Sequence, residues 1–340
     1  MLLLLPKRRT LGFSLVELMV SIAVGLIVLG AVTAVFSSMS RSNQALANTS
    51  QQIQNGSYAA QFLSDDLRHA GYFGGVYNPA APLAGLPDPC VTNNVATLRA
   101  ALALPVQGYD APAAPPVACI PASDFVPGTD VLVVRRVSTV LTLPASLNAQ
   151  DVYVQNNNDW TDANNPVLNN GLAANFPLLK KDGVTAADIR KYYVRIYYVS
   201  PCNVYAPGAN ACSAAADAGN PVPTLKMLEL QASTGGPTLT SVAVAQGVEN
   251  LQIDYGIDAT GEGLAQNFVS IPGSMADWTN VVELKLSMLV RNPQATLNYV
   301  DAKTYTLGSV TVVTPGGPFK RHVFTQQVRL TNVAETRETP

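Results

Sequence analysis

The chain has 340 residues, a formal net charge of −2, and charged side chains at only 13% of its positions. That length exceeds the usual size of one compact domain, so we expect an anchor followed by one elaborated head. The only run of three basic residues is Lys7, Arg8 and Arg9, whereas a phosphate-binding surface needs clustered Lys and Arg, so a nucleic acid is excluded as the expected partner.

Residues 13–36 form an apolar stretch with a single charged side chain, Glu17. At ~1.5 Å per residue a helix of this length spans the roughly 30 Å core of a bilayer. The basic run at residues 7–9 precedes the stretch and no comparable cluster follows closely, so we expect the N-terminus to stay in the cytoplasm. The sequence therefore predicts a single-pass inner-membrane protein whose remainder is exported to the periplasm.

The segment KRRTLGFSLVE, residues 7–17, resembles the processing site of type IV prepilins. The resemblance implies that prepilin peptidase cuts between Gly12 and Phe13 and that the new amino group is methylated. It divides the chain into a leader (1–12), a transmembrane helix (13–36), a periplasmic continuation of that helix (37–70) and a globular periplasmic head (71–340). An ordinary secretory signal would instead have a shorter apolar core with its cut site after it.

Glu17 is the one carboxylate in the membrane stretch. Insertion scales assign such a group about 2.5–3.5 kcal/mol, so it should have a partner and a function. The amine created at Phe13 is the natural partner, because a cation at the positive end of the helix dipole gains from a nearby carboxylate. The prepilin resemblance implies the same pairing between neighbouring subunits during filament assembly. The alternative is an incidental Glu near the helix start.

Beyond residue 36 the chain becomes polar, but apolar residues recur at intervals that fit a helical stripe as far as about Ala70. The stripe consists of Leu46, Ile53, Phe62, Leu63 and Leu67. The next segment, DLRHAGYFG at residues 66–74, resembles the region where the long helix ends in minor pilins of the PilW type. Gly71 also suits a helix end, since glycine readily adopts the left-handed conformation found there.

Residues 74–128 and 144–188 are rich in Pro, Ala, Gly and Asn, which predicts large loop insertions able to carry partner contacts. Four cysteines behind an export signal predict two disulfides, with four free thiols as the alternative. The candidates are Cys90, Cys119, Cys202 and Cys212. Proximity favours Cys202–Cys212 and leaves Cys90 for Cys119, although the sequence permits three connectivities.

Strand patterns dominate the second half of the chain. Apolar and polar residues alternate over residues 193–198, 251–257 and 282–290, and a final strand is expected near 323–330. The segments GVENLQIDYG (247–256), 281–291 and 321–324 also resemble PilW proteins. Together these features predict a pilin-like α+β fold, in which a long membrane-spanning helix packs on a mainly antiparallel β-sheet head.

Chemistry-bearing motifs are scarce. Metalloprotease, nucleophile-elbow, P-loop and dinucleotide fingerprints are missing from the sequence, and it holds only two histidines, His69 and His322. Residues 258–263 offer Asp258 and Glu262 as weak calcium ligands, but too few oxygen donors surround them, and a Gly-rich hairpin turn is the alternative. We therefore expect no catalytic residues, no metal site beyond this weak calcium candidate and no cofactor.

Taken with these patterns, the resemblance implies a structural, non-enzymatic minor pilin that helps initiate a type IV pilus and is expected at or near the filament tip. The PilW resemblance implies prepilin peptidase, other minor pilins, the major pilin and the inner-membrane assembly platform as partners. A minor pseudopilin of type II secretion is a close alternative. A signal-anchored periplasmic adhesin or enzyme is a third, but it would need neither Gly12 nor Glu17.

The mature chain should begin at a methylated Phe13, which N-terminal mass spectrometry of membrane-extracted protein will detect. Replacing Gly12 with Val should leave the leader attached, because a branched side chain then occupies the cut site. An intact leader on the wild-type protein would contradict the prepilin interpretation.

Overall fold

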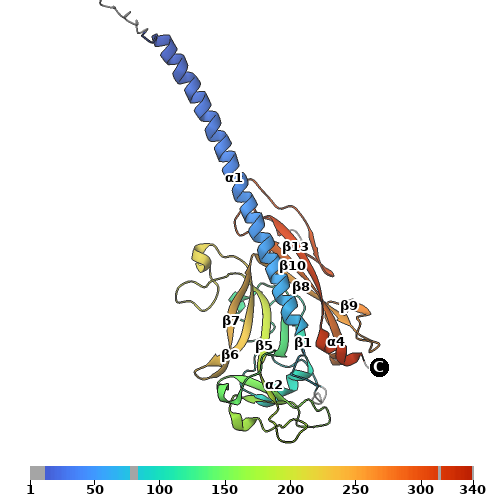
Figure 1. Cartoon of the computed structure of the whole chain (residues 1–340). Helices are drawn as coiled ribbons and strands as arrows, with labels where there is room; N and C mark the ends of the chain where they lie inside the picture. The colour runs from blue at the N-terminus through green and yellow to red at the C-terminus, as the bar shows by residue number, and fades with distance from the viewer. Residues whose placement is uncertain (1–11, 77–82, 313–314, 339–340) are drawn as a thin grey trace, which may run out of the picture. The chain divides into compact units, whose positions relative to one another are not determined.

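The computed structural model describes residues 12–76, 83–312 and 315–338, so most of the expected leader lies outside the described residues. The chain forms two compact units, one ending at Ser50 and one starting at Gln51. Helix α1 (Leu15–Arg68) belongs to both and is continuous between them (Figure 1). The expected membrane helix and its continuation are therefore one helix of 54 residues, which begins at Leu15 and ends at Arg68.

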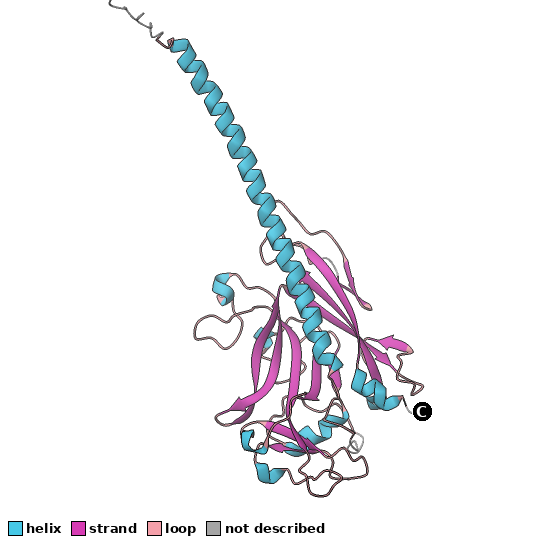
Figure 2. Ribbon diagram, viewed as in Figure 1, coloured by secondary structure: helices cyan, strands magenta, loops and turns pink. Residues whose placement is uncertain are grey.

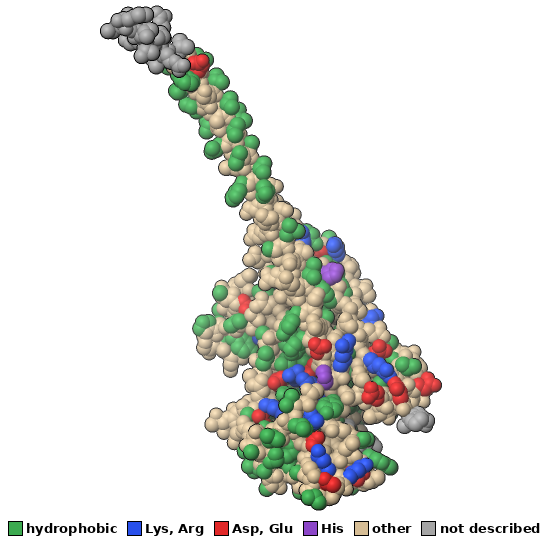
Figure 3. All heavy atoms as spheres, viewed as in Figure 1, with side chains coloured by type: hydrophobic (Ala, Val, Ile, Leu, Met, Phe, Trp, Pro, Cys, Tyr) green, Lys and Arg blue, Asp and Glu red, His purple; other side chains and the backbone are tan. Residues whose placement is uncertain are grey.

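The first unit consists of the N-terminal part of α1. Within the described residues, α1 is the one helix long and apolar enough to cross a membrane. Its large apolar side chains are exposed, and hydrophobic atoms cover this part of the helix in Figure 3. Apolar groups gain free energy when they leave water, so this surface needs lipid or protein around it.

The second unit includes the last turns of α1, where one face of the helix is buried. Ala59, Leu63 and Leu67 are completely buried there, which confirms the C-terminal part of the predicted stripe. The prediction was wrong for Leu46, which is exposed, and for Ile53, which is half exposed. Gly56 lies on the buried face, where a Cβ atom would clash with the Phe324 ring.

The first sheet of this unit has seven antiparallel strands, ordered β1-β2-β5-β3-β4, with β6 paired to both β5 and β7. Figure 2 shows all strands in magenta and the helices in cyan. Strand β5 is central because β2 pairs with one of its edges and β3 and β6 pair with successive parts of the other. The strands are β1 (Val106–Tyr109), β2 (Val131–Val137), β3 (Val152–Asn156), β4 (Val167–Asn170), β5 (Asp188–Ser200), β6 (Thr224–Ser233) and β7 (Gly236–Gln246).

The second sheet is antiparallel with the order β13-β10-β8-β9. Its strands are β8 (Val248–Ile257), β9 (Asn267–Val269), β10 (Val281–Arg291) and β13 (Arg321–Arg329), and β11 (Tyr305–Leu307) pairs with β12 (Val310–Val312) in a separate hairpin. The chain passes from the first sheet to the second at Gly247. Its φ is +84°, and the Arg291 carbonyl oxygen lies 2.7 Å from where a Cβ atom would be, so glycine is the residue that fits this corner.

Short helices complete the second unit. They are α2 (Val95–Ala100), α3 (Met275–Thr279) and α4 (Thr331–Arg337), with 3₁₀ turns at Ala101–Ala103, Ala122–Asp124, Pro144–Ser146, Ala173–Asn175 and Ala216–Gly219. The four segments predicted as strands correspond to β5, β8, β10 and β13 and are confirmed.

The central strand of the first sheet, β5, contributes side chains to a core on each face. Tyr197 and Val199 of β5 join the core under α1, together with residues of the second sheet. Val194, Ile196 and Tyr198 of the same strand face a separate core. The segment between residues 74 and 128 covers this second core through Leu98, Leu102, Ile120 and Phe125.

The two segments predicted to be loop insertions therefore hold more regular structure than expected. Residues 74–128 contain α2 and β1, and residues 144–188 contain β3 and β4. These strands are four or five residues long, and every residue of β3 is buried. A short strand buried on both faces has no alternation of polar and apolar residues, so its pattern cannot be distinguished from that of a loop.

Both predicted disulfides are present, and both pairings are those that proximity favoured. Cys90 is bonded to Cys119 and Cys202 to Cys212. The first lies against the second core, where both half-buried cysteines pack. The Cys90–Cys119 bond thus joins two parts of the 74–128 segment that covers this core. The Cys202–Cys212 bond closes the loop that follows β5.

Asp66, in the last turn of α1, connects the helix to the first sheet. Its carboxylate is nearly inaccessible to solvent and accepts hydrogen bonds from Arg136 Nε at 2.6 Å, Arg195 Nη1 at 2.7 Å and the Tyr197 hydroxyl at 2.7 Å. Arg136 belongs to β2, and Arg195 and Tyr197 belong to β5. The helix end and two central strands thus share one buried anion.

Asp130, just before β2, connects the two sheets. It is 1% exposed, and its carboxylate oxygens accept hydrogen bonds from the backbone N–H groups of Ala111 at 2.8 Å and Ile253 at 2.7 Å. Burial raises the pKa of Asp130 to about 7, although these two N–H groups act in the opposite direction. Between the ordinary pKa of an aspartate and pH 7, the native state therefore binds a proton here that the unfolded chain has released.

Replacing Asp66 with Asn should destabilise the second unit by about 2–4 kcal/mol, because Arg136 and Arg195 lose their buried anion. Chemical denaturation of the full-length chain in detergent, followed by near-UV circular dichroism, measures the loss. The adjacent Asp65 is exposed, so Asp65→Asn is a matched control that should change stability by less than about 0.5 kcal/mol. Equal effects of the two substitutions would contradict the role given to Asp66.

The pKa of Asp130 predicts a specific pH dependence. An acid whose pKa is raised in the native state stabilises that state at low pH, and this contribution is lost as the pH rises from its ordinary pKa to about 7. From pH 5.5 to pH 8 the wild-type chain should therefore lose more stability than the Asp130→Asn variant. Parallel denaturation curves at the two pH values provide the test, and an equal loss in both proteins would show that Asp130 does not titrate in this range.

Candidate functional site: the helix start and the head motifs

The start of α1 contains an N-terminal capping box. The Glu17 carboxylate accepts a hydrogen bond from the Ser14 backbone N–H at 2.9 Å, and the Ser14 hydroxyl accepts one from the Val16 N–H at 3.3 Å. The Ser-x-x-Glu spacing of residues 14–17 is the signature of this arrangement, in which the acidic side chain turns back toward the helix start. Glu17 therefore has a local role that the sequence analysis did not predict, since it satisfies an N–H group that the helix leaves free.

The predicted processing junction lies immediately before this box. Gly12 and Phe13 are exposed, and Phe13 shows 81% of its surface. A Cβ atom added to Gly12 would meet no described atom of the chain. The junction is thus exposed, and the Glu17 side chain turns back to Ser14, the residue that follows it.

The head motifs that resemble PilW proteins meet at one place in the second unit. Glu249, from residues 247–256, forms ion pairs with Arg291 at the end of β10 and with Arg321 at the start of β13. Its Oε1 accepts from Arg291 Nη1 at 3.3 Å and from Arg321 Nη2 at 3.1 Å. Segments far apart in the sequence are therefore joined by one carboxylate.

Asp301 extends this network. It is 1% exposed and accepts hydrogen bonds from Arg321 Nη1 at 2.9 Å and from the Tyr305 hydroxyl at 2.8 Å. Burial acts to lower the pKa of Arg321, but Glu249 and Asp301 outweigh it, so the pKa lies above its ordinary value. The guanidinium is held in its charged form between two carboxylates, an arrangement suited to fixing the fold.

The last turns of α1 contact the same region through side-chain amides. Gln52 donates to the carbonyl oxygens of Val290 at 2.6 Å and Lys320 at 3.2 Å, and Asn55 donates to that of Gln246 at 3.1 Å. These carbonyls lie at the ends of strands, beside the ion-pair network. Sequence reasoning identified the segments but missed the network, because a single charged residue in a strand gives no sign of its partner.

Asp258, one of the two weak calcium candidates, lies in a turn where its carboxylate already has hydrogen-bond and ion-pair partners. Both Asp258 oxygens accept hydrogen bonds from loop N–H groups, including those of Gly261 at 2.8 Å and Gly263 at 3.0 Å, and Arg337 Nε lies 2.7 Å from Oδ2. Burial alone would raise the pKa of Asp258, but Arg337 and these donors hold it below its ordinary value. Glu262 is exposed. A calcium ion would therefore have to displace Arg337 from its partner.

The described residues contain no group of three or more His, Cys, Asp or Glu side chains arranged to hold a metal ion. His69 Nδ1 lies 2.7 Å from the Asp65 carbonyl oxygen, and His322 stacks edge-on with Phe324. A polar hollow of about 390 Å³ lies beside Gly74, Asn156–Asn158 and Lys180. Its asparagines are already bonded to the loops that they shape, as in the 2.8 Å bond from Val76 N–H to Asn158 Oδ1.

Comparison with known families gave two matches. Residues 204–332 match the model described as Type IV Pilus-assembly protein W, and residues 7–33 match the Prokaryotic N-terminal methylation motif. Comparison with curated proteins and with solved structures gave no significant match. The first match includes Glu249, Arg291 and Arg321, and the second includes Gly12, Phe13 and Glu17. Over these residues the chain is similar to PilW proteins and carries an N-terminal methylation motif, the combination that a pilin-like protein of the PilW type has.

Proposed function

We propose that the protein is a minor pilin that takes part in the assembly of a type IV pilus and lies at or near the filament tip. The observation that carries the proposal is the start of α1, where Glu17 turns toward an exposed processing junction at the head of an apolar helix. Both family matches support a pilus-related role. A structural role fits better than a catalytic one, because the polar residues of the matched head segments are engaged in ion pairs with each other.

Processing would convert this helix start into an assembly contact. Cleavage by prepilin peptidase after Gly12 leaves an amine at Phe13, next to the positive end of the helix dipole, where a cation is unfavourable. A carboxylate in the same low-dielectric layer offsets that charge. Glu17 of one subunit would therefore pair with the Phe13 amine of a neighbour, either another minor pilin or the major pilin.

The membrane orientation follows from the charges that flank the helix. Lys7, Arg8 and Arg9 would keep the N-terminus in the cytoplasm, beside the assembly platform of the inner membrane. The head would then enter the periplasm, an oxidising compartment in which disulfides such as Cys90–Cys119 and Cys202–Cys212 persist. Gly25 and Gly30, which have open space beside them, would let neighbouring helices approach closely.

A position at the tip is supported by the size of the head and by its covering segments. Residues 74–128 and 144–188 enlarge the side of the first sheet that faces away from α1. A subunit at the tip has no neighbour above it, so it can carry such additions without blocking the stacking of further subunits. These segments expose apolar side chains such as Trp160, Leu172 and Val184, which would be available for contacts with other tip subunits.

Two substitutions separate the assembly role of Glu17 from its capping role. Glu17→Gln keeps the capping-box geometry, since Gln serves at that position as well as Glu, but removes the negative charge. Ser14→Ala removes the capping hydroxyl and keeps the charge. We expect few surface filaments with Glu17→Gln and nearly normal numbers with Ser14→Ala, counted by electron microscopy in strains that carry only the variant copy.

Mass spectrometry of each variant must show cleavage after Gly12, so that a processing defect is not mistaken for an assembly defect. A strain that lacks the protein, studied with and without filament retraction, gives the number of filaments that form when initiation by this protein is lost. Wild-type filament numbers with Glu17→Gln would refute the charge pairing. Wild-type numbers in the deletion strain with retraction intact would refute the proposed role in initiation.

A further inference from the structure

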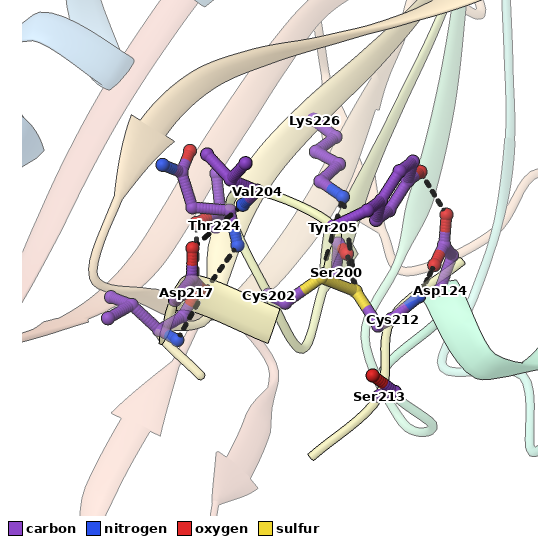
Figure 4. Close-up of a disulfide and its surroundings, with 12 residues drawn as sticks. Asp124, Ser200, Cys202, Val204, Tyr205, Cys212, Ser213, Asp217, Thr224 and Lys226 are labelled. Atoms are coloured by element: carbon purple, nitrogen blue, oxygen red, sulfur yellow. Dashed lines mark hydrogen bonds between the residues drawn. A yellow bond between two sulfur atoms is a disulfide. The ribbon is translucent and has the colours of Figure 1, made fainter. Parts of the chain in front are cut away.

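The disulfide Cys202–Cys212 closes the loop that follows β5, and its two cysteines differ in exposure to solvent. Cys202 is completely buried, whereas Cys212 is partly exposed at the edge of the loop. Figure 4 shows the bond with Lys226, Tyr205 and Ser200 around it. Cys212 is therefore the cysteine that a thiol arriving from solvent meets first.

Lys226 of β6 lies beside this bond. It is 2% exposed, and its Nζ is 3.9 Å from each of the two sulfur atoms and 4.1 Å from the centre of the Tyr205 ring. Among the described residues, no carboxylate lies within ion-pair distance of this amine. Burial lowers the pKa of Lys226, and the more distant Asp124 and Asp217 offset this only in part. The lysine is thus a buried cation whose nearest potential anions are the two sulfur atoms.

Two carboxylates hold the loop independently of the disulfide. Asp217 accepts hydrogen bonds from the backbone N–H groups of Asn203 at 2.9 Å and Val204 at 2.8 Å. Asp124 accepts from the Cys212 N–H at 2.6 Å and from the Tyr205 hydroxyl. Both ends of the loop are therefore anchored, so the sulfur atoms should stay near Lys226 after their bond is broken.

We propose that Cys202–Cys212 is a thiol-exchange site that reacts with a protein dithiol. The attacking thiolate forms a bond to Cys212 Sγ, the disulfide breaks, and its electron pair leaves on Cys202 Sγ as a thiolate next to the Lys226 ammonium. The second thiol of the reductant then attacks the mixed disulfide, releases the Cys212 thiolate and is itself left oxidised as a disulfide. Protons lost by the dithiol are taken up by the two cysteine thiolates, so the dithiol is oxidised as the cysteine pair is reduced.

The difference in exposure between the two cysteines determines which one is attacked, and Lys226, at 3.9 Å from both sulfur atoms, raises the rate. A nearby cation lowers the pKa of a thiol, and a leaving thiol of lower pKa departs faster. The other disulfide provides an internal comparison, because Cys90 and Cys119 are both partly exposed and the hydrogen bond described for Cys90 Sγ comes from the Cys119 backbone N–H. Exposure alone would make Cys90–Cys119 the more reactive bond, whereas the charge of Lys226 beside both sulfur atoms makes Cys202–Cys212 the more reactive one.

The test exposes the full-length protein in detergent to glutathione, followed by an acid quench, alkylation of free thiols and peptide mass spectrometry. In the wild type we expect Cys202–Cys212 to open before Cys90–Cys119, with the glutathione adduct on Cys212. Lys226→Met, which removes the charge and nearly keeps the shape, should slow the opening of Cys202–Cys212 by on the order of tenfold and leave Cys90–Cys119 unchanged. Lys226→Arg keeps a cation and should preserve the wild-type order.

Several outcomes would overturn the proposal. They are earlier opening of Cys90–Cys119 in the wild type, an adduct mainly on Cys202, and equal rates for the wild type and Lys226→Met. The order of opening in the wild type requires no substitution, so the proposal can be tested even if a Lys226 variant misfolds. The proposal does not depend on the pilus role, because its readout is chemical and does not involve filaments.

Discussion

The Asp66 carboxylate has almost no contact with water, and its charge is balanced by Arg136 and Arg195 from the first sheet. A buried anion must keep such partners, because leaving it unpaired is far more unfavourable than the pair itself is favourable. The rotation of the last turns of α1 is thereby restricted. With Asp66 facing β2 and β5, Leu63 and Leu67 necessarily face the core that both sheets share.

A similar group of largely buried, paired charges lies at the strand ends of the second sheet. Glu249 and Asp301 enclose Arg321, and Arg291 adds a further ion pair. Each partner comes from a different part of the chain, and Gln52 of α1 bonds to the backbone beside them. The segments that match the PilW family thus include those that join the helix to the second sheet.

The covering segments have a physical role in the head besides any contact with partners. A sheet with apolar side chains on both faces needs a layer on each, and α1 supplies only one. Residues 74–128 supply the other, and the Cys90–Cys119 bond holds that layer together where regular structure is sparse. The Cys202–Cys212 bond is not needed in the same way to hold its loop, since Asp124 and Asp217 already anchor that loop. Its neighbour is the buried Lys226.

From the sequence alone, the features that depend on neighbours along the chain could be predicted. The helix beginning near Phe13, the four long strands and both disulfides follow from hydropathy, periodicity and spacing, which act locally. The short buried strands, the ion pairs of Asp66 and Glu249, and the place of Lys226 beside two sulfur atoms could not. Those features arise where distant segments meet, and only the tertiary structure decides which charges become buried together, because the free energy of a buried charge depends on partners that its own segment does not contain.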